Sequence, residues 1–169
     1  RYLARVYGAR QDTALLQALL RGVEYLLEAQ YPNGGWPQFY PLRKGYYSHI
    51  TFNDNAMVNV LEVLYDIAKG SGEMSFAPAG LRARASAAVE KGVACILDCQ
   101  VRVSGDLTAW CQQHDERTLR PAPARAYELI SLSGSETVGI LRFLMRIEKP
   151  GPRIVESVES AVRWLNTVA

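Results

Sequence analysis

The amino-acid sequence predicts an all-α protein, an α/α toroid in which antiparallel helix pairs repeat and long loops carry the functional site. Three observations lead to this prediction. Apolar residues recur with the 3.6-residue period of a helix through most of the chain. The alternation typical of strands is nearly absent. A unit made of a helix, a long loop and a buried helix occurs twice, and repeated units of this kind stack on one another to form a common core.

The repeat is visible as residue-by-residue similarity at offsets of about 70–80 residues. Gly22–Gln30 aligns with Gly92–Gln100, 70 residues later, and residues 161–165 fit a third copy. The loops and buried helices of the first two units align as 35–38 with 109–112 and as 58–64 with 138–144.

The start of the chain fits the same pattern. Arg1–Val6 is similar to Arg142–Ile147, which is the late part of a buried helix. The chain therefore begins inside a helix pair. We expect residues 1–169 to form a single partial domain, truncated at both ends and belonging to a longer protein.

The first two long helices have clear ends. Asp12 is expected to cap a helix that runs to about Gln30. The next helix is expected to begin near Thr51 or Asn53, with Asn53 as its N-cap, and to end before Gly70. This second helix is apolar almost all round, which is typical of a helix buried on most sides.

Four further helices follow. The periodicity predicts a helix over Ala79–Gln100, a short helical turn over 125–130 and another helix over Glu136–Lys149. Pro152 suits the first turn of a last helix.

Composition and charge exclude several classes of protein. Apolar residues make up 49% of the chain and charged residues 21%, which is typical of a folded globular protein. The formal net charge of +2 is too small to indicate nucleic-acid binding. No run of about 18 apolar residues is present, so the sequence predicts no membrane-spanning helix.

The three cysteines are too few for a disulfide scaffold. Cys95 and Cys99 are spaced four residues apart on a predicted helix, which favours small buried side chains. A bridge between Cys99 and Cys111 would need an oxidising compartment, and the sequence leaves this open.

The first long loop and the helix that follows it contain candidate site residues. Trp36 and Tyr40 could stack on sugar rings or pack on the core. His49 closes the loop and leads into Asp54 and Asn55 at the start of a buried helix. Capping of that helix would explain one acidic residue. A hydrogen-bonding or oxygen-ligand pair that faces a cleft would explain why a long loop delivers both.

The second long loop, residues 101–123, contains Asp115 and Glu116. Their carboxylates are hard oxygen ligands that suit Ca²⁺, although a solvated run of charges is the alternative. Neither an HxxH nor a CxxC pair is present, so a zinc site has little support.

Basic residues crowd the same loops. A guanidinium group binds a carboxylate through two hydrogen bonds, so aromatic rings beside such groups suggest an acidic sugar polymer as the ligand. The basic loop residues are Arg43, Lys44, Arg117, Arg120 and Arg125. Among them, Lys44 and Arg125 are the candidates for substrate binding. Nucleotide-binding glycine motifs and the GxSxG motif are absent.

Four segments resemble one family, the family 10 polysaccharide lyases, which are pectate lyases. They are Tyr31–Leu42, His49–Met57, Ala109–Asp115 and Pro121–Glu128. The resemblance covers essentially the whole chain. It implies an α/α toroid that cleaves α-1,4-polygalacturonate by calcium-dependent β-elimination and releases unsaturated oligogalacturonates.

The resemblance also implies roles for particular residues. Asp115 falls where the family has a calcium carboxylate, and Asp54 with Asn55 falls on its catalytic run. Glu116 as a second Ca²⁺ ligand and Lys44 and Arg125 as substrate-binding residues come from the chemistry of their side chains. Trp36, Tyr40 and His49 lie within the segments that resemble the family, and they are further candidate substrate-binding residues.

The family uses an arginine as its catalytic base, which we expect beyond Ala169. An isolated chain of these 169 residues is then expected to be inactive or nearly so. The polymeric substrate implies a secreted or periplasmic protein, and we expect a monomer within a longer chain, without nucleic-acid or membrane partners.

Two other readings remain open. A non-catalytic module that binds acidic polysaccharides would need the same loops without the base. An isoprenoid cyclase-like toroid is suggested by Gln30, Gly34 and Trp36 in a Q-x3-G-x-W pattern, but no DxDD or DDxxD run accompanies it.

Overall fold

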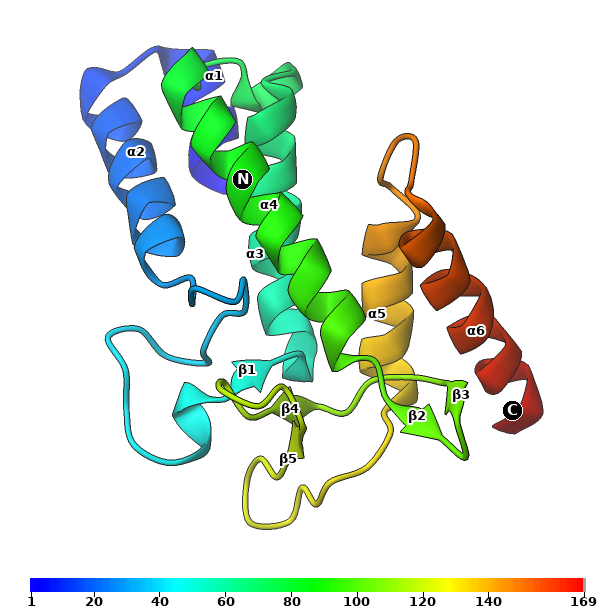
Figure 1. Ribbon diagram of the computed structural model, residues 1–169. Coiled ribbons are helices and arrows are strands. Elements are labelled where there is room, and N and C mark those ends of the chain that lie inside the picture. Colours follow the sequence, from blue (N-terminus) through cyan, green and yellow to red (C-terminus); the bar gives the residue numbers. More distant parts are fainter. Residues whose placement is uncertain (169) are drawn as a thin grey trace.

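The computed structural model describes residues 1–168; the predicted domain boundary at Ala169 lies outside them. Within these residues the chain is mostly helical (Figure 1). The α-helices are α1 (Tyr2–Arg10), α2 (Thr13–Glu28), α3 (Ala56–Lys69), α4 (Ala79–Cys99), α5 (Gly134–Leu144) and α6 (Pro152–Val168). Short 3-10 helices cover Tyr46–Ser48, Asn53–Asn55 and Gly72–Met74. The strands are β1 (Ile50–Thr51), β2 (Arg102–Val103), β3 (Asp106–Leu107), β4 (Gln113–His114) and β5 (Pro121–Ala122).

Most predicted helix ends are confirmed. The Asp12 carboxylate accepts hydrogen bonds from the backbone N–H groups of Ala14, at 2.7 Å, and Leu15, at 3.4 Å, as expected of an N-cap. Helix α3 ends at Lys69, and Gly70 follows with a left-handed φ of 60°. Helix α4 ends one residue before the predicted position, and α6 begins at Pro152.

The predicted start of α3 is wrong. The helix begins at Ala56, because Asp54 and Asn55 have φ values of 54° and 57°, in the left-handed region that a right-handed helix excludes. Asn53 lies in the preceding 3-10 helix, and its side chain makes no capping hydrogen bond. The polar run is therefore a kinked entry to α3.

Two further boundaries differ from the prediction. Residues 125–130 form a turn in place of a helix, since the backbone N–H of Glu128 bonds the carbonyl of Arg125 and the chain then becomes extended. Helix α5 ends at Leu144, five residues before Lys149, and the following residues form a turn.

The repeat is confirmed by two equivalent tryptophan contacts. The indole N–H of Trp36 donates to the carbonyl of Leu26, at 2.7 Å. The indole N–H of Trp110 donates to the carbonyl of Ile96, at 2.8 Å. Leu26 and Ile96 are equivalent positions of the aligned helices α2 and α4. Each long loop is therefore fastened in the same way to the end of its own helix.

Two equivalent glutamines extend this pattern to the next repeat. The side-chain amide of Gln30 donates to the carbonyl of Ala88 in α4, at 2.8 Å, and that of Gln100 donates to the carbonyl of Ser157 in α6, at 3.0 Å. Each glutamine follows the last turn of one helix, and its side chain links that helix to the corresponding helix of the following unit. The structure thus links α2, α4 and α6 in sequence.

The long loops gather at one end of the helix array, shown at the bottom of Figure 1. There they form a small antiparallel sheet in the order β1-β4-β5, with Ile50 opposite His114 and Gln113 opposite Ala122. The apolar core lies above this sheet and is formed mainly by α3 and α4 with Trp36, Phe52 and Trp110. The sheet therefore joins two loops that are far apart in sequence.

The antiparallel helix pairs agree with the all-α prediction, and the toroid remains a prediction. All three cysteines are buried and free. Among the described residues, no helix has both the length and the apolar character needed to cross a membrane.

Candidate functional site

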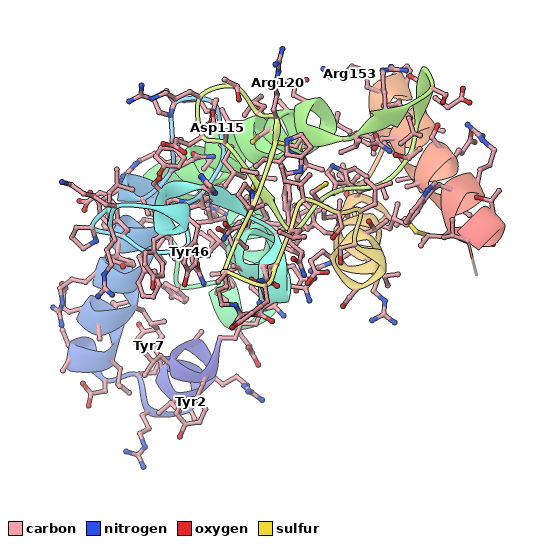
Figure 2. All side chains as sticks on the ribbon, turned by 90° about the horizontal axis from the view of Figure 1, so that it is seen from below. Tyr2, Tyr7, Tyr46, Asp115, Arg120 and Arg153 are labelled. Atoms are coloured by element: carbon pink, nitrogen blue, oxygen red, sulfur yellow. The ribbon has the colours of Figure 1, made fainter. Side chains whose placement is uncertain are left out.

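Backbone hydrogen bonds bring the two predicted polar runs to the same end of the molecule. The N–H groups of Phe52 and Asn53 both donate to the carbonyl of Gln112, each at 2.9 Å. This contact and the β1–β4 pairing place residues 49–55 beside residues 112–115. Figure 2 looks onto this loop end, where Asp115 and Tyr46 lie, while Tyr2 and Tyr7 lie at the periphery on α1.

Three side chains at this end are close enough together to hold a cation. His49, Asp115 and Glu116 each offer one ligand atom, and these atoms lie within 4.8 Å of one another. Asp115 and Glu116 are the two residues that the sequence predicts as metal ligands, and His49 was predicted to bind substrate. The register explains the grouping, because Ile50 faces His114 and their neighbours His49 and Asp115 then lie side by side.

The Asp115 carboxylate is fixed by its own loop. Its Oδ1 accepts hydrogen bonds from the N–H groups of Thr118, at 2.7 Å, and Arg117, at 3.0 Å, and from the Thr118 hydroxyl, at 2.8 Å. The hydrogen bonds from Thr118 are the main reason why the pKa of Asp115 lies below its usual value. The carboxylate is thus ionised and oriented, with Oδ2 outside this set of bonds.

His49 is held in one tautomer. Its Nδ1 lies 3.2 Å from the carbonyl oxygen of Pro123 and 3.3 Å from Oε1 of Gln113. Both partners are acceptors, so Nδ1 carries a proton and Nε2 of the neutral ring keeps a lone pair. A histidine that ligates a metal commonly donates its other N–H to a backbone carbonyl in this way.

These residues supply part of the coordination that a divalent cation such as Ca²⁺ needs. Ca²⁺ prefers six to eight oxygen ligands. Asp115 and Glu116 supply carboxylate oxygens, so water and a bound acidic ligand would have to complete the coordination. The nitrogen of His49 is a poorer ligand for Ca²⁺ than an oxygen atom. The donor set therefore suits an ion shared between the protein and a carboxylate ligand.

A second charged group lies next to the cluster. The guanidinium Nε of Arg125 donates to the Glu128 carboxylate, at 2.9 Å, and Nη2 donates to its other oxygen. This pairing lowers the pKa of Glu128 to about 2 and is the main reason why the pKa of Arg125 is raised. The negative charge of Asp54 is a smaller contribution to the raised pKa of Arg125.

The structure does not bring Asp54 into the cluster of His49, Asp115 and Glu116, as far as residues 1–168 are concerned. The predicted catalytic role of Asp54 stays a prediction, separate from the predicted cation ligands Asp115 and Glu116. Asp115 lies beside His49 at one end of β1, whereas Asp54 follows β1 at its other end. Both flank strand β1, at the end of the molecule where the long loops gather.

Asn55 lies against helix α5. A Cβ atom added at Gly139 would overlap its Oδ1, so the amide fits only because residue 139 is glycine. This Oδ1 is buried and has no hydrogen-bond partner among the described residues. The predicted catalytic pair is thus divided, with an exposed Asp54 and a largely covered Asn55.

Of the two alternatives given for Trp36, stacking on a sugar ring or packing on the core, the structure shows packing on the core. Its side chain is only 3% exposed, and its N–H is used by the carbonyl of Leu26. Gly34 and Gly35 allow the loop to lie directly on the backbone of Lys91 and the side chain of Ile50. The aromatic motif therefore packs the loop onto the core.

Trp36→Phe is expected to destabilise the chain without weakening the binding of an acidic sugar. It leaves the partly buried carbonyl of Leu26 without its donor, which costs about 1 kcal/mol. Denaturant unfolding measures the stability, and calorimetric titration with trigalacturonate measures the affinity. A weaker affinity for trigalacturonate at an unchanged free energy of unfolding would show that Trp36 contributes to binding.

Tyr40 and Lys44 are not joined to either charged group by a hydrogen bond or ion pair within residues 1–168. The ring of Tyr40 packs edge-on against Tyr25 of α2, with centroids 5.5 Å apart, and its carbonyl accepts the Tyr25 hydroxyl. Lys44 is exposed. Their predicted role in substrate binding remains a prediction.

Sequence reasoning missed three residues that shape the site. Glu128 pairs with Arg125, and its spacing of three residues was a usable signal. Asn33 donates to the carbonyl of Glu116 at 2.8 Å, and Ser48 lies 3.4 Å from the Glu116 carboxylate. These last two contacts span 83 and 68 residues, so no local pattern could have revealed them.

His114 has a structural role beside the cluster. It is fully buried, its Nδ1 lies 2.9 Å from the carbonyl of Leu119, and its ring packs edge-on against Phe52. Burial lowers its pKa, so the ring is neutral at neutral pH. It supports the Asp115 loop from inside.

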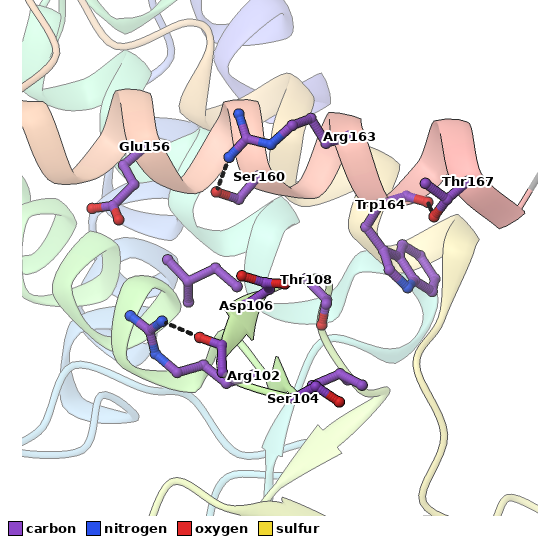
Figure 3. Close-up of a pocket in the computed structure, with 12 residues that line it drawn as sticks. Arg102, Ser104, Asp106, Thr108, Glu156, Ser160, Arg163, Trp164 and Thr167 are labelled. Atoms are coloured by element: carbon purple, nitrogen blue, oxygen red, sulfur yellow. Dashed lines mark hydrogen bonds between the residues drawn. The ribbon is translucent and has the colours of Figure 1, made fainter.

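A separate hollow of about 530 Å³ lies between the β2–β3 hairpin and α6 (Figure 3). Arg102, Arg163 and Trp164 line it together with the acidic residues Asp106 and Glu156. None of the predicted site residues lines this hollow. The candidate site is therefore the loop surface around Asp115 and Arg125.

Comparison with known proteins identifies the family of this chain. The sequence profile of a family described as Pectic acid lyase matches residues 1–169. Two solved structures of a Family 10 polysaccharide lyase from Cellvibrio cellulosa are each 41% identical and superpose with a TM-score of 0.94. One of these is a mutant in complex with trigalacturonic acid. No curated protein matches significantly.

The similarity covers 98% of this chain and 52% and 51% of those two structures, so the chain spans about half of their length. The predicted resemblance to family 10 polysaccharide lyases is confirmed. Since the family profile extends over the whole sequence, the chain belongs to the pectic acid lyase family.

Proposed function

We propose that this chain supplies the calcium- and substrate-binding part of a pectate lyase. The enzyme would cleave α-1,4-polygalacturonate by β-elimination and release unsaturated oligogalacturonates, in a secreted or periplasmic setting. One observation carries the proposal: two carboxylates that suit a hard cation lie at the same loop end as an arginine that suits a uronate carboxylate. Membership of the pectic acid lyase family and the trigalacturonic acid complex of a relative support the choice of ligand.

The chemistry assigns a task to each group. When bound, Ca²⁺ would withdraw charge from the uronate carboxylate and make the C5 proton more acidic. Asp115 and Glu116 would hold the ion, and the proton on Nδ1 of His49 would keep that ring in place. Arg125 would bind a neighbouring uronate carboxylate. Asp54 and Asn55 would contact the sugar at the start of α3.

Calorimetric titration of the chain with trigalacturonate, with and without Ca²⁺, tests this proposal. We expect the affinity to rise at least about tenfold with Ca²⁺, equivalent to about 1.4 kcal/mol. Mg²⁺ should substitute poorly, because it is smaller and loses its water less readily. Maltotriose, which carries no carboxylates, serves as the matched ligand control and should not bind.

Two outcomes would contradict the proposal. Equal affinity in the presence of a chelator would indicate a calcium-independent module that binds acidic polysaccharides. Absence of trigalacturonate binding at saturating Ca²⁺ would remove the acidic sugar as the ligand.

A further inference from the structure

The segment between residues 124 and 128 is a closed turn at the candidate site. The N–H of Ala124 donates to the carbonyl of Glu128, at 3.0 Å, and the N–H of Glu128 donates to the carbonyl of Arg125, at 2.8 Å. These two backbone bonds bring the side chains of Arg125 and Glu128 face to face. Their pairing is thus determined by the backbone as well as by charge.

Glu128 receives several hydrogen bonds at once. Its carboxylate accepts the backbone N–H of Arg125, at 3.1 Å, the Nε–H of the same residue, at 2.9 Å, and an N–H from Nη2. Glu128 is thus held to the turn that carries Arg125 through both the backbone and the side chain of that residue.

The two partners differ in exposure. The side chain of Glu128 is 19% exposed and that of Arg125 is 59% exposed. A guanidinium group has five N–H donors in a rigid fork, and Glu128 uses the edge formed by Nε and Nη2. Within residues 1–168 no other hydrogen bond is made to the edge formed by Nη1 and Nη2, and this edge suits a second carboxylate.

We propose that Glu128 is a positioning residue that holds the guanidinium of Arg125 in place, with one edge open to a uronate carboxylate. This inference rests on the proposed function of the site. Fixing a long side chain during binding costs conformational entropy. In this protein Glu128 fixes Arg125 before the ligand arrives. The role of Glu128 is therefore to order Arg125, since its negative charge by itself would weaken the attraction for an anion.

A double-mutant cycle in the intact chain tests the inference. Glu128→Ala is expected to weaken trigalacturonate binding in the presence of Ca²⁺ by about 2- to 12-fold, the loss that corresponds to one immobilised side chain. Glu128→Gln keeps one oxygen acceptor and should bind more tightly than the alanine variant. In an Arg125→Ala background, Glu128→Ala should have no further effect, because it acts through Arg125.

The matched control is Glu24→Ala. It breaks another exposed two-bond pair, in which Arg84 of α4 donates to Glu24 of α2 at 2.6 and 2.7 Å, on helices outside the loop cluster. This variant should retain the wild-type affinity. A decrease equal to that of Glu128→Ala would mean that loss of any surface pair weakens binding, and the inference would be wrong.

A measurement without ligand separates this inference from the proposed function. In nuclear magnetic resonance spectra, the Nε–H signal of Arg125 should exchange slowly with water in the wild type and rapidly in Glu128→Ala. If the wild type does not bind trigalacturonate, the proposed function fails, and this signal still shows whether Glu128 orders Arg125. If the wild type binds and Glu128→Ala keeps both its affinity and the slow exchange, Glu128 has no positioning role.

Discussion

Asp115→Asn is expected to weaken Ca²⁺ binding by about 100-fold, because the affinity of such a site depends on the number of charged ligands. Asparagine keeps a side-chain oxygen that can accept the hydrogen bonds from Arg117 and Thr118, so the loop should keep its shape. Only the charge and one potential ligand oxygen are lost. The substitution therefore separates a role in cation binding from a role in loop structure.

Calcium titration by calorimetry and thermal unfolding are the two measurements needed for this variant. Asp106→Asn is the matched control, since Asp106 is an exposed acid on the β2–β3 hairpin outside the cluster. The control should bind Ca²⁺ as the wild type does. Unchanged Ca²⁺ affinity in Asp115→Asn would exclude Asp115 from the cation site.

Gly139→Ala is expected to destabilise the protein by about 1–3 kcal/mol, as overpacking of a filled site does. In the interior of an ordinary helix the same change gains up to about 1 kcal/mol. The sign is reversed here because the new methyl group would overlap Oδ1 of Asn55. The side chain of Asn55 would have to move, and the binding of trigalacturonate should weaken with it.

A substitution of Asn55, whose side chain the new methyl group would overlap, tests this explanation. Asn55→Gly removes the side chain and suits the left-handed φ of 57°. In that background Gly139→Ala should become stabilising. Gly22→Ala in α2 is the matched control, because no heavy atom lies within 4 Å of the Cβ position there. If Gly139→Ala stabilised the wild type as Gly22→Ala does, the contact between Gly139 and Asn55 would be unimportant.

The helices could be predicted because their signals are local. Asp12, Gly70 and Pro152 act within one turn of the backbone, through a side-chain cap, a left-handed conformation and a fixed φ. The family resemblance is local in the same sense, since it rests on contiguous segments. These features do not depend on how the helices pack.

The fate of the aromatic and polar loop residues could not be predicted in the same way. An exposed ring that stacks on sugar and a buried ring that fastens a loop have the same sequence signal, and the close approach allowed by Gly34 and Gly35 decided for burial of Trp36. Asp54 likewise had the sequence signal of a first-turn residue after the expected N-cap Asn53. In the structure Phe52 and Asn53 donate to the carbonyl of Gln112, and Asp54 lies in a kinked entry to α3.

The sequence by itself determined the helical repeat, the family and the identity of the acidic residues at the site. Only the tertiary structure decided which of them meet. Strands β1 and β4 have two residues each, too few to show an alternating pattern, yet their register places His49 beside Asp115 and, among the described residues, leaves Asp54 outside this cluster. The physical reason is that helix signals depend on neighbours within a turn, whereas a site depends on contacts across more than 60 residues of chain.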